Sequence, residues 1–135
     1  MALIPFDDRD GVIWMNGEMV DWRDAKTHTL SHALHYGSQV FEGERAYAGN
    51  IFKSREHTQR LRQSCRYLDF ELPVSDEELD GIKHQVLAAN YITDGYVRAF
   101  CWRGSEMMAI SAQETKIHLA VAAWQWPSYF DPEVK

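Results

Sequence analysis

A nine-residue segment, 39–47, carries the residue types that a binding site for a small anion needs. If this segment is a β-strand, alternate side chains point to the same side. One side then carries an apolar wall, a gap without a side chain, a fixed positive charge and a phenol, supplied by Phe41, Gly43, Arg45 and Tyr47. These groups suit an amphipathic anion with an apolar tail. An ordinary hairpin strand with a glycine at a bulge has the same pattern, so the rest of the chain must decide.

Two further positions place guanidinium groups where they could bind anions. Tyr96 and Arg98 are two residues apart in an expected strand, so their side chains project from one side about 7 Å apart. A phenol beside a guanidinium suits a carboxylate, although an exposed strand face with a solvated arginine gives the same pattern. Arg60 lies in a basic helix beside His57 and Ser64, where it could hold a phosphate or belong to a solvated face.

Metal binding and nucleophilic chemistry have weaker support. His28, His32 and His35 fall on one side of an expected helix at a spacing that could bind zinc, but no cysteine or carboxylate completes a ligand set. We therefore expect packed or capping histidines and no metal site. The sequence contains no GxSxG, CxxC or P-loop motif, and no lysine stands in an apolar segment that would lower its pKa.

Aromatic residues gather around Pro127, near the end of the sequence. They could form core, a partner interface or the wall of an apolar pocket, and their types do not choose between these roles. The group comprises Trp124, Trp126, Tyr129 and Phe130.

Turn and cap signals predict the elements that must position these residues. Asn-Gly at 16–17 and Gly-Asn at 49–50 are typical of hairpin turns. Ser75 and Glu78 form a capping box, which opens a helix. Hydrophobic spacing predicts its buried stripe as Leu79, Ile82, Val86 and Ala89.

Strands and helices are segregated along the chain. This order predicts an α+β domain with a mostly antiparallel sheet and two main helices packed on it. The expected elements are a hairpin of 12–15 and 19–20, a short helix 29–35 that stops at Gly37, a hairpin of 40–47 and 51–52, helices 54–68 and 75–90, and strands 96–103 and 117–124.

Composition narrows the class of protein. The 135 residues are 45% hydrophobic and 13% aromatic, which fits one globular domain. A net charge of −6 argues against a general nucleic-acid binder. Cys65 and Cys101 sit in apolar-periodic stretches, as in a reducing compartment. With no secretory signal at the start and no uncharged segment long enough to span a bilayer, we expect a soluble cytoplasmic protein with no membrane partner.

The order of these motifs resembles that of the branched-chain amino acid aminotransferases, which belong to fold type IV of the pyridoxal-phosphate (PLP) enzymes. The resemblance covers the chain from about Val12 and corresponds to the small N-terminal domain of that family. It implies a tail at 1–11, the small domain at 12–130, and the start of a linker to a C-terminal domain at 131–135. The matching segments are 14–20, 31–37, 40–43, 45–47, 55–57, 59–61, 96–98 and 122–129.

The resemblance implies a role for each matching position. Arg60 corresponds to the arginine that binds the phosphate of PLP, and Tyr96 to the tyrosine that hydrogen-bonds the substrate α-carboxylate. Arg98, with Gly43 beside it, corresponds to the site for the side-chain carboxylate of glutamate, and Arg45 to an arginine that shapes the site. The walls of the aliphatic pocket correspond to Phe41, Trp126 and Tyr129, and the residues lent to a partner subunit's pocket to Tyr36 and Ile110.

Two departures from the family pattern qualify these expectations. Glu44 replaces a residue that is commonly apolar or neutral, and strand alternation points it away from the pocket, so we expect a local salt bridge. The lysine that forms the Schiff base with PLP belongs to the family's C-terminal domain, so we expect no catalytic residue in these 135 residues and no transaminase activity from them alone.

The resemblance implies a full-length enzyme that moves amino groups between branched-chain L-amino acids and 2-oxoglutarate. It implies small-molecule partners, the amino acids and 2-oxo acids, and a homodimer or higher homo-oligomer. Two alternatives within the same fold are a D-amino acid aminotransferase and an aminodeoxychorismate lyase. An alternative from another class is a non-catalytic domain that binds carboxylates or mediates dimerisation.

Overall fold

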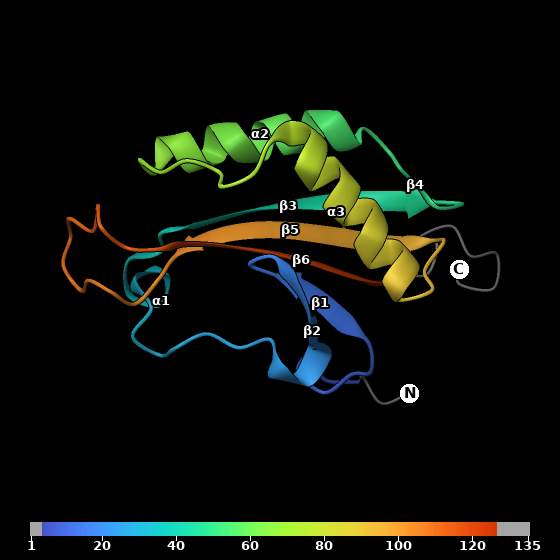
Figure 1. Ribbon diagram of the computed structural model, residues 1–135, viewed down its shortest axis with the longest axis horizontal. Helices are drawn as coiled ribbons and strands as arrows, with labels where there is room; N and C mark the ends of the chain where they lie inside the picture. Colours follow the sequence, from blue (N-terminus) through green and yellow to red (C-terminus); the bar gives the residue numbers. More distant parts are fainter. Residues whose placement is uncertain (1–3, 127–135) are drawn as a thin grey trace, which may run out of the picture.

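An antiparallel sheet organises the chain and carries two helices on one of its faces (Figure 1). The computed structural model describes residues 4–126. Within them the sheet has six strands in the order β2-β1-β6-β5-β3-β4, so β6 pairs with β1 and β5 with β3, which lie far apart from them in the sequence. This is the α+β arrangement that the sequence predicts. The strands are β1 (Val12–Met15), β2 (Glu18–Asp21), β3 (Gln39–Tyr47), β4 (Asn50–Ile51), β5 (Gly95–Arg103) and β6 (Ile117–Gln125).

Cap signals predict some helix ends better than others: the start of α3 follows its signal, whereas α2 begins after Lys53 with no side-chain cap. The two long ones are α2 (Ser54–Tyr67) and α3 (Asp76–Ala89), and the two short ones are η1 (Trp22–Asp24) and α1 (His32–Tyr36). The predicted capping box opens α3, with Ser75 Oγ accepting a hydrogen bond from the Glu78 amide at 3.1 Å. α1 begins later than predicted but ends as predicted at Gly37, whose φ of 69° suits a left-handed C-cap. No helix in the described part of the chain is long and apolar enough to cross a membrane.

The two hairpin turns differ in how well the sequence predicts them. Asn16 and Gly17 both have positive φ, 52° and 98°, as their types predict for a two-residue hairpin turn. In the second hairpin Tyr47 pairs with Asn50, so Asn50 belongs to β4 and the turn lies at Ala48 and Gly49. The sequence-based placement of that turn is therefore one residue too late.

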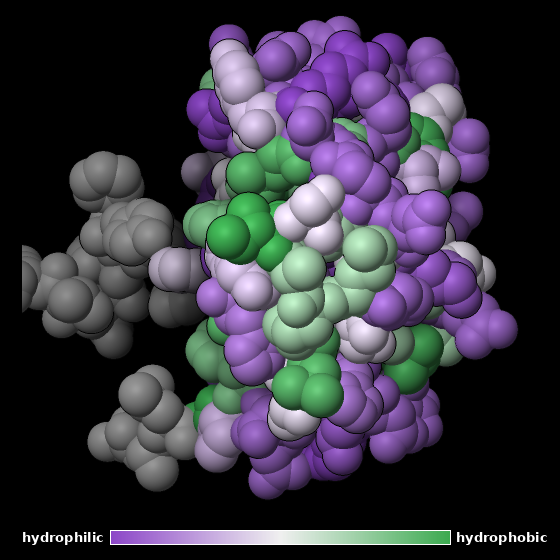
Figure 2. All heavy atoms as spheres, turned by 90° about the vertical axis from the view of Figure 1, so that its left-hand side faces the viewer, coloured by the Kyte–Doolittle hydropathy of each residue, from purple (hydrophilic) through white to green (hydrophobic). Residues whose placement is uncertain are grey.

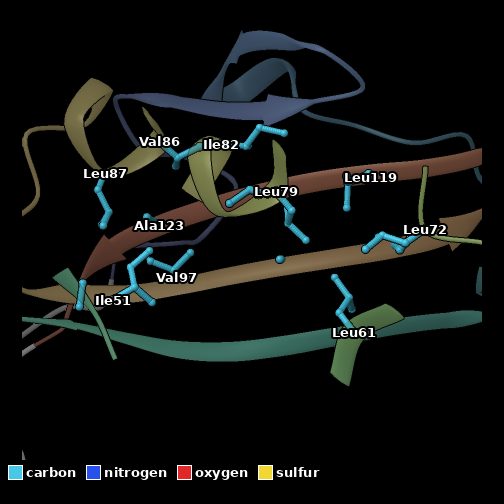
Figure 3. Packing of buried hydrophobic residues seen from close by; sticks show 14 of the residues in the cluster. Ile51, Leu61, Leu72, Leu79, Ile82, Val86, Leu87, Val97, Leu119 and Ala123 are labelled. Carbon is cyan, nitrogen blue, oxygen red and sulfur yellow. The ribbon is translucent and has the colours of Figure 1, made fainter. Parts of the chain in front are cut away.

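The main core lies between the helices and the sheet (Figure 3). It combines the inner stripes of α2 and α3 with alternate residues of β5 and β6. Contrary to the predicted stripe, Ala89 is exposed and does not belong to this core, and Leu87 is buried at that end of α3. The largest apolar side chains with no exposed surface or almost none are Leu61, Leu79, Val86, Val97, Leu119 and Val121.

The opposite face of the sheet is only partly covered. A second, smaller cluster there joins Ala33 of α1 to Trp102 and Ala120, with Met15 and Phe100 packed against it. Toward the other end of this face, where β3 and β5 continue, Phe41 and Tyr47 are exposed. Residues 4–126 thus leave the predicted anion-binding face of β3 open.

Candidate functional site

The register between β3 and β5 brings the two predicted groups of site residues together. Gly43 lies opposite Arg98, and Arg45 lies opposite Tyr96. Paired residues in adjacent strands share a face, so the face predicted for β3 continues directly into the predicted Tyr96/Arg98 pair. The pairing runs without interruption from 39 to 46, so Gly43 is not at a bulge. This excludes the ordinary-bulge interpretation of the glycine.

Gly43 provides space for the phenol of Tyr96. A Cβ atom built on Gly43 would overlap the hydroxyl oxygen of Tyr96 and lie 3.0 Å from two of its ring carbons. The phenol therefore occupies the gap that the missing side chain leaves on β3. The glycine is needed here for clearance.

Tyr96, Arg98 and Phe41 form a connected group on this open face. Arg98 Nη1 donates a hydrogen bond to Tyr96 Oη at 3.0 Å, and the Arg98 guanidinium lies 3.6 Å from the centre of the Phe41 ring. The ring face favours the cation and restrains its orientation. The phenol hydrogen and the remaining guanidinium N–H groups can then donate to a carboxylate, beside an aromatic surface suited to an apolar tail.

An arginine and two tryptophans extend this group. Arg45 Nη2 donates to the backbone carbonyl of Trp126 at 2.8 Å. The Tyr96 ring centre lies 4.7 Å from that of Trp124 and 4.9 Å from that of Trp126. Trp124 pairs with Tyr96 across β5 and β6, a position that the aromatic grouping in the sequence indicated without assigning it a role. Tyr129 lies outside the described residues.

Arg60 is on the other side of β3, the side that faces the helices. Its Nε and Nη2 donate to both carboxylate oxygens of Glu42 at 2.7–3.0 Å, and His57 Nδ1 lies 2.7 Å from Glu42 Oε1. Burial by itself would raise the pKa of Glu42, but the hydrogen bonds from Arg60 and His57 hold it below its usual value. Arg60 therefore does not join the Tyr96/Arg98 group directly. Glu42, between Phe41 and Gly43 in the strand, connects them.

Glu44 forms the local salt bridge that the sequence predicts. Its Oε1 accepts a hydrogen bond from Lys83 Nζ at 2.7 Å, and both side chains are fully buried. Lys83 also donates to Thr58 Oγ1 and to the Ser54 carbonyl. Burial raises the pKa of Glu44, although the positive charge of Lys83 opposes this. The sequence did not predict the burial of Lys83, because a lysine in a helix is usually a surface residue.

Tyr36 and Ile110 are at a different end of the molecule. Both line a cavity of about 370 Å³, and both are exposed, Ile110 by 89%. His32 connects their segments, since it stacks on Tyr36 at 4.4 Å and its Nε2 hydrogen-bonds the Ala109 carbonyl at 2.7 Å. The structure does not bring these two residues to the Tyr96/Arg98 group within this chain.

Only His32 and His35 lie in α1, and His28 precedes it, so the three histidines do not share one side of a helix as predicted. Each takes part in hydrogen bonds with its own surroundings. His32 Nδ1 bonds Ser38 Oγ, His35 Nε2 bonds the Thr29 carbonyl, and His28 Nδ1 accepts from the Leu30 amide. These bonds fit the packing and capping roles that the sequence favours. Among the described residues no group of three or more His, Cys, Asp or Glu side chains could hold a metal ion.

Comparison with known proteins assigns the chain to a family. The profile of Amino-transferase class IV matches residues 39–135, and the chain belongs to this family. It is 42% identical over 130 residues to the branched-chain-amino-acid aminotransferase of Pseudomonas aeruginosa, covering 93% of this chain and 42% of that protein. It is 40% identical over 126 residues to the corresponding enzyme of Salmonella typhimurium, covering 90% of this chain and 41% of that protein.

Solved structures show the same fold. The crystal structure of the Escherichia coli branched-chain amino acid aminotransferase superposes with a TM-score of 0.84 at 38% identity, over 93% of this chain and 43% of that one. The T.th. branched-chain amino acid aminotransferase with pyridoxamine 5'-phosphate gives a TM-score of 0.86 at 38% identity, with the same coverage. The chain therefore spans about two fifths of the length of the relatives it matches.

Proposed function

We propose that this chain is the small N-terminal domain of a transaminase that moves the amino group between branched-chain L-amino acids and 2-oxoglutarate. The observation that carries the proposal is the Tyr96/Arg98 pair, seated over Gly43 and against Phe41. A phenol and a guanidinium beside an aromatic surface suit substrates that share one carboxylate but differ in whether the side chain is apolar or charged. Membership of Amino-transferase class IV, and relatives named as branched-chain aminotransferases, support it.

In this proposal each residue of the open face has one task. Tyr96 donates to the substrate α-carboxylate. Arg98 donates to the side-chain carboxylate when glutamate or 2-oxoglutarate is bound. Arg45 supports this face through its bond to the Trp126 carbonyl. Apolar side chains of the substrate lie against Phe41, Trp126 and Tyr129.

Pyridoxal phosphate is the cofactor that the proposal requires, and Arg60 fits its phosphate. The Arg60 side chain is 67% exposed, and Nη1 donates no hydrogen bond within residues 4–126, so one edge of the guanidinium remains for a phosphate. The group supplies the electron sink for amino transfer when it is bound. This chain's contribution is to hold the phosphate and to orient the substrate.

We also propose that the enzyme is a cytoplasmic homodimer or higher oligomer in which Tyr36 and Ile110 enter the partner's pocket. Figure 2 shows apolar side chains gathered at the end of the molecule formed by α1 and the β5–β6 connection, with polar side chains around them. A second copy of this chain would cover such a patch. Its exposed apolar residues are Leu30, Leu34, Tyr36, Met108 and Ile110.

A substrate panel on the enzyme encoded by the complete gene tests the proposed function. We expect turnover of leucine, isoleucine and valine with 2-oxoglutarate, and none from a protein limited to residues 1–135. Preference for D-alanine would establish a D-amino acid aminotransferase instead, and pyruvate release from aminodeoxychorismate would establish the lyase. Binding of carboxylates by an enzymatically inactive complete protein would favour the binding-domain alternative.

A further inference from the structure

We propose that Glu42 is a positioning residue for the phosphate-binding arginine: it fixes the guanidinium of Arg60 so that the Nη1 edge is presented to the cofactor phosphate. The inference rests on the proposed function, in which Arg60 contacts that phosphate. It adds a residue that touches neither cofactor nor substrate and acts through the arginine.

The first support is the contrast in burial between the two partners. The Glu42 side chain is 5% exposed, whereas that of Arg60 is 67% exposed. A buried carboxylate on a central segment of β3 is held by the sheet. An exposed arginine has many rotamers, and fixing one of them has an entropic cost. The pair therefore restrains the arginine, because the carboxylate is the fixed member.

The second support is the geometry of the contact. Arg60 Nε lies 2.8 Å from Glu42 Oε2 and 3.0 Å from Oε1, while Nη2 lies 2.7 Å from Oε1. The carboxylate thus meets the guanidinium along its Nε/Nη2 edge. The guanidinium is planar, so fixing this edge fixes the direction of the Nη1 hydrogens as well. The arginine is then already oriented when it binds a phosphate.

The third support is a second clamp on the same carboxylate. His57, which is one helical turn before Arg60 in α2, places Nδ1 at 2.7 Å from Glu42 Oε1. The Glu42 carboxylate is therefore fixed from α2 by two side chains. The nearest like charge on this face of β3, Glu44, is paired with Lys83. Among the described residues, the ion-pair partners of Glu42 are thus Arg60 and His57, both from α2.

The proposal is testable because the negative charge of Glu42 and its positioning of Arg60 have opposite effects on phosphate binding. A carboxylate beside Arg60 reduces the positive potential that attracts a phosphate. If Glu42 mattered only through charge, its neutralisation would tighten phosphate binding. If it positions Arg60, its removal weakens phosphate binding in spite of the more favourable charge.

The experiment uses the apoenzyme prepared from the complete protein and measures dissociation constants for PLP and for pyridoxal, which lacks the phosphate. We expect Glu42→Gln to weaken PLP binding about tenfold, which corresponds to ~1.4 kcal/mol, and to leave pyridoxal binding unchanged. Glu42→Asp keeps the charge but shortens the side chain, so it should weaken PLP binding in the same direction. This second variant keeps the test valid if Glu42→Gln does not fold.

Two further variants complete the test. Glu56→Gln removes a charge from an exposed site on the same helix and should leave both constants unchanged. Arg60→Ala should weaken PLP but not pyridoxal, and adding Glu42→Gln to it should have no further effect, because the two residues act as a unit.

Each other outcome overturns the proposal in an identifiable way. If Arg60→Ala weakens PLP binding but neither Glu42 variant does, Glu42 does not position the arginine, and the proposed function stands. If Arg60→Ala leaves the PLP-to-pyridoxal ratio unchanged, the phosphate role of Arg60 itself is wrong. Equal weakening of both ligands by Glu42→Gln would show a structural role only.

Discussion

The two faces of β3 use charged residues in opposite ways. On the open face, Arg45 and Arg98 contact a carbonyl, a phenol and an aromatic ring, and neither takes part in an ion pair within residues 4–126. On the helix side, Glu42 and Glu44 are buried and each is paired with a cation. Cations whose partners are neutral keep their charge for a ligand, whereas paired charges hold the fold or orient a neighbour.

The largest expected effect is on the helix face. Lys83→Met leaves the Glu44 carboxylate buried without its partner, so the free energy of unfolding should fall by about 3–5 kcal/mol. Urea unfolding of the purified protein measures this. Adding Glu44→Leu should recover most of the loss, because an apolar pair has no charge to desolvate. A loss below about 1 kcal/mol from Lys83→Met would show that the pair is not part of the fold's stability.

The next effect should fall on activity and spare stability. Gly43→Ala places a methyl group against the Tyr96 phenol and should displace that phenol from the proposed carboxylate site. We expect kcat/KM for leucine in the complete enzyme to fall by about 100-fold, as small misplacements of positioning groups do. The matched control is Gly81→Ala in α3, where a Cβ meets open space. It should stabilise the protein by up to ~1 kcal/mol without affecting turnover.

Arg98→Met should weaken binding of 2-oxoglutarate much more than binding of leucine. Loss of a hydrogen bond to a charged group costs about 1.5–3 kcal/mol, so KM for 2-oxoglutarate should rise by roughly 10–100-fold. Leucine has no side-chain carboxylate and should be affected much less. The control is Arg66→Met, which removes an exposed arginine of α2 that pairs with Glu71. An equal effect on both substrates would mean that Arg98 does not bind the side-chain carboxylate.

The smallest effect is on the pH dependence of stability. The pKa of Glu42 is lowered in the folded protein, so its pairing stabilises fully above its ordinary pKa of 4.5 and is lost as pH falls through the lowered value. Glu42→Gln should therefore lose less stability than the parent on acidification below pH 4.5. Thermal unfolding across that range measures it. A steeper loss in the variant would contradict the pairing.

The sequence predicted much of this architecture because its strongest signals are local. Alternation along 39–47 placed Glu44 on the face opposite Gly43 and gave it a salt bridge. The capping box at Ser75 opened α3, and Gly37 ended α1. The roles that family resemblance gave to the site residues, including Arg60, Tyr96 and Arg98 as well as Tyr36, Ile110 and Tyr129, remain predictions.

Sequence reasoning failed where the outcome depended on distant partners. Lys83 can be buried because β3 presents Glu44, 39 residues earlier, and α2 presents the Thr58 hydroxyl and the Ser54 carbonyl as further hydrogen-bond acceptors. The buried positions of α3 follow the full helical spacing i, i+3, i+4, i+7 and i+8 from Leu79, which includes Lys83 and Leu87 and leaves Ala89 exposed. Glu42 stood inside a recognised motif, yet its neighbours along the strand gave no sign of its contact with Arg60.

By itself the sequence determined which residues share a face of β3, because a strand repeats every two residues whatever surrounds it. Tertiary structure decided the rest. The register of β3 on β5 placed Gly43 under the Tyr96 phenol, and the packing of α2 joined Arg60 to Glu42. These pairings depend on how segments far apart in the chain dock, and no local period specifies that.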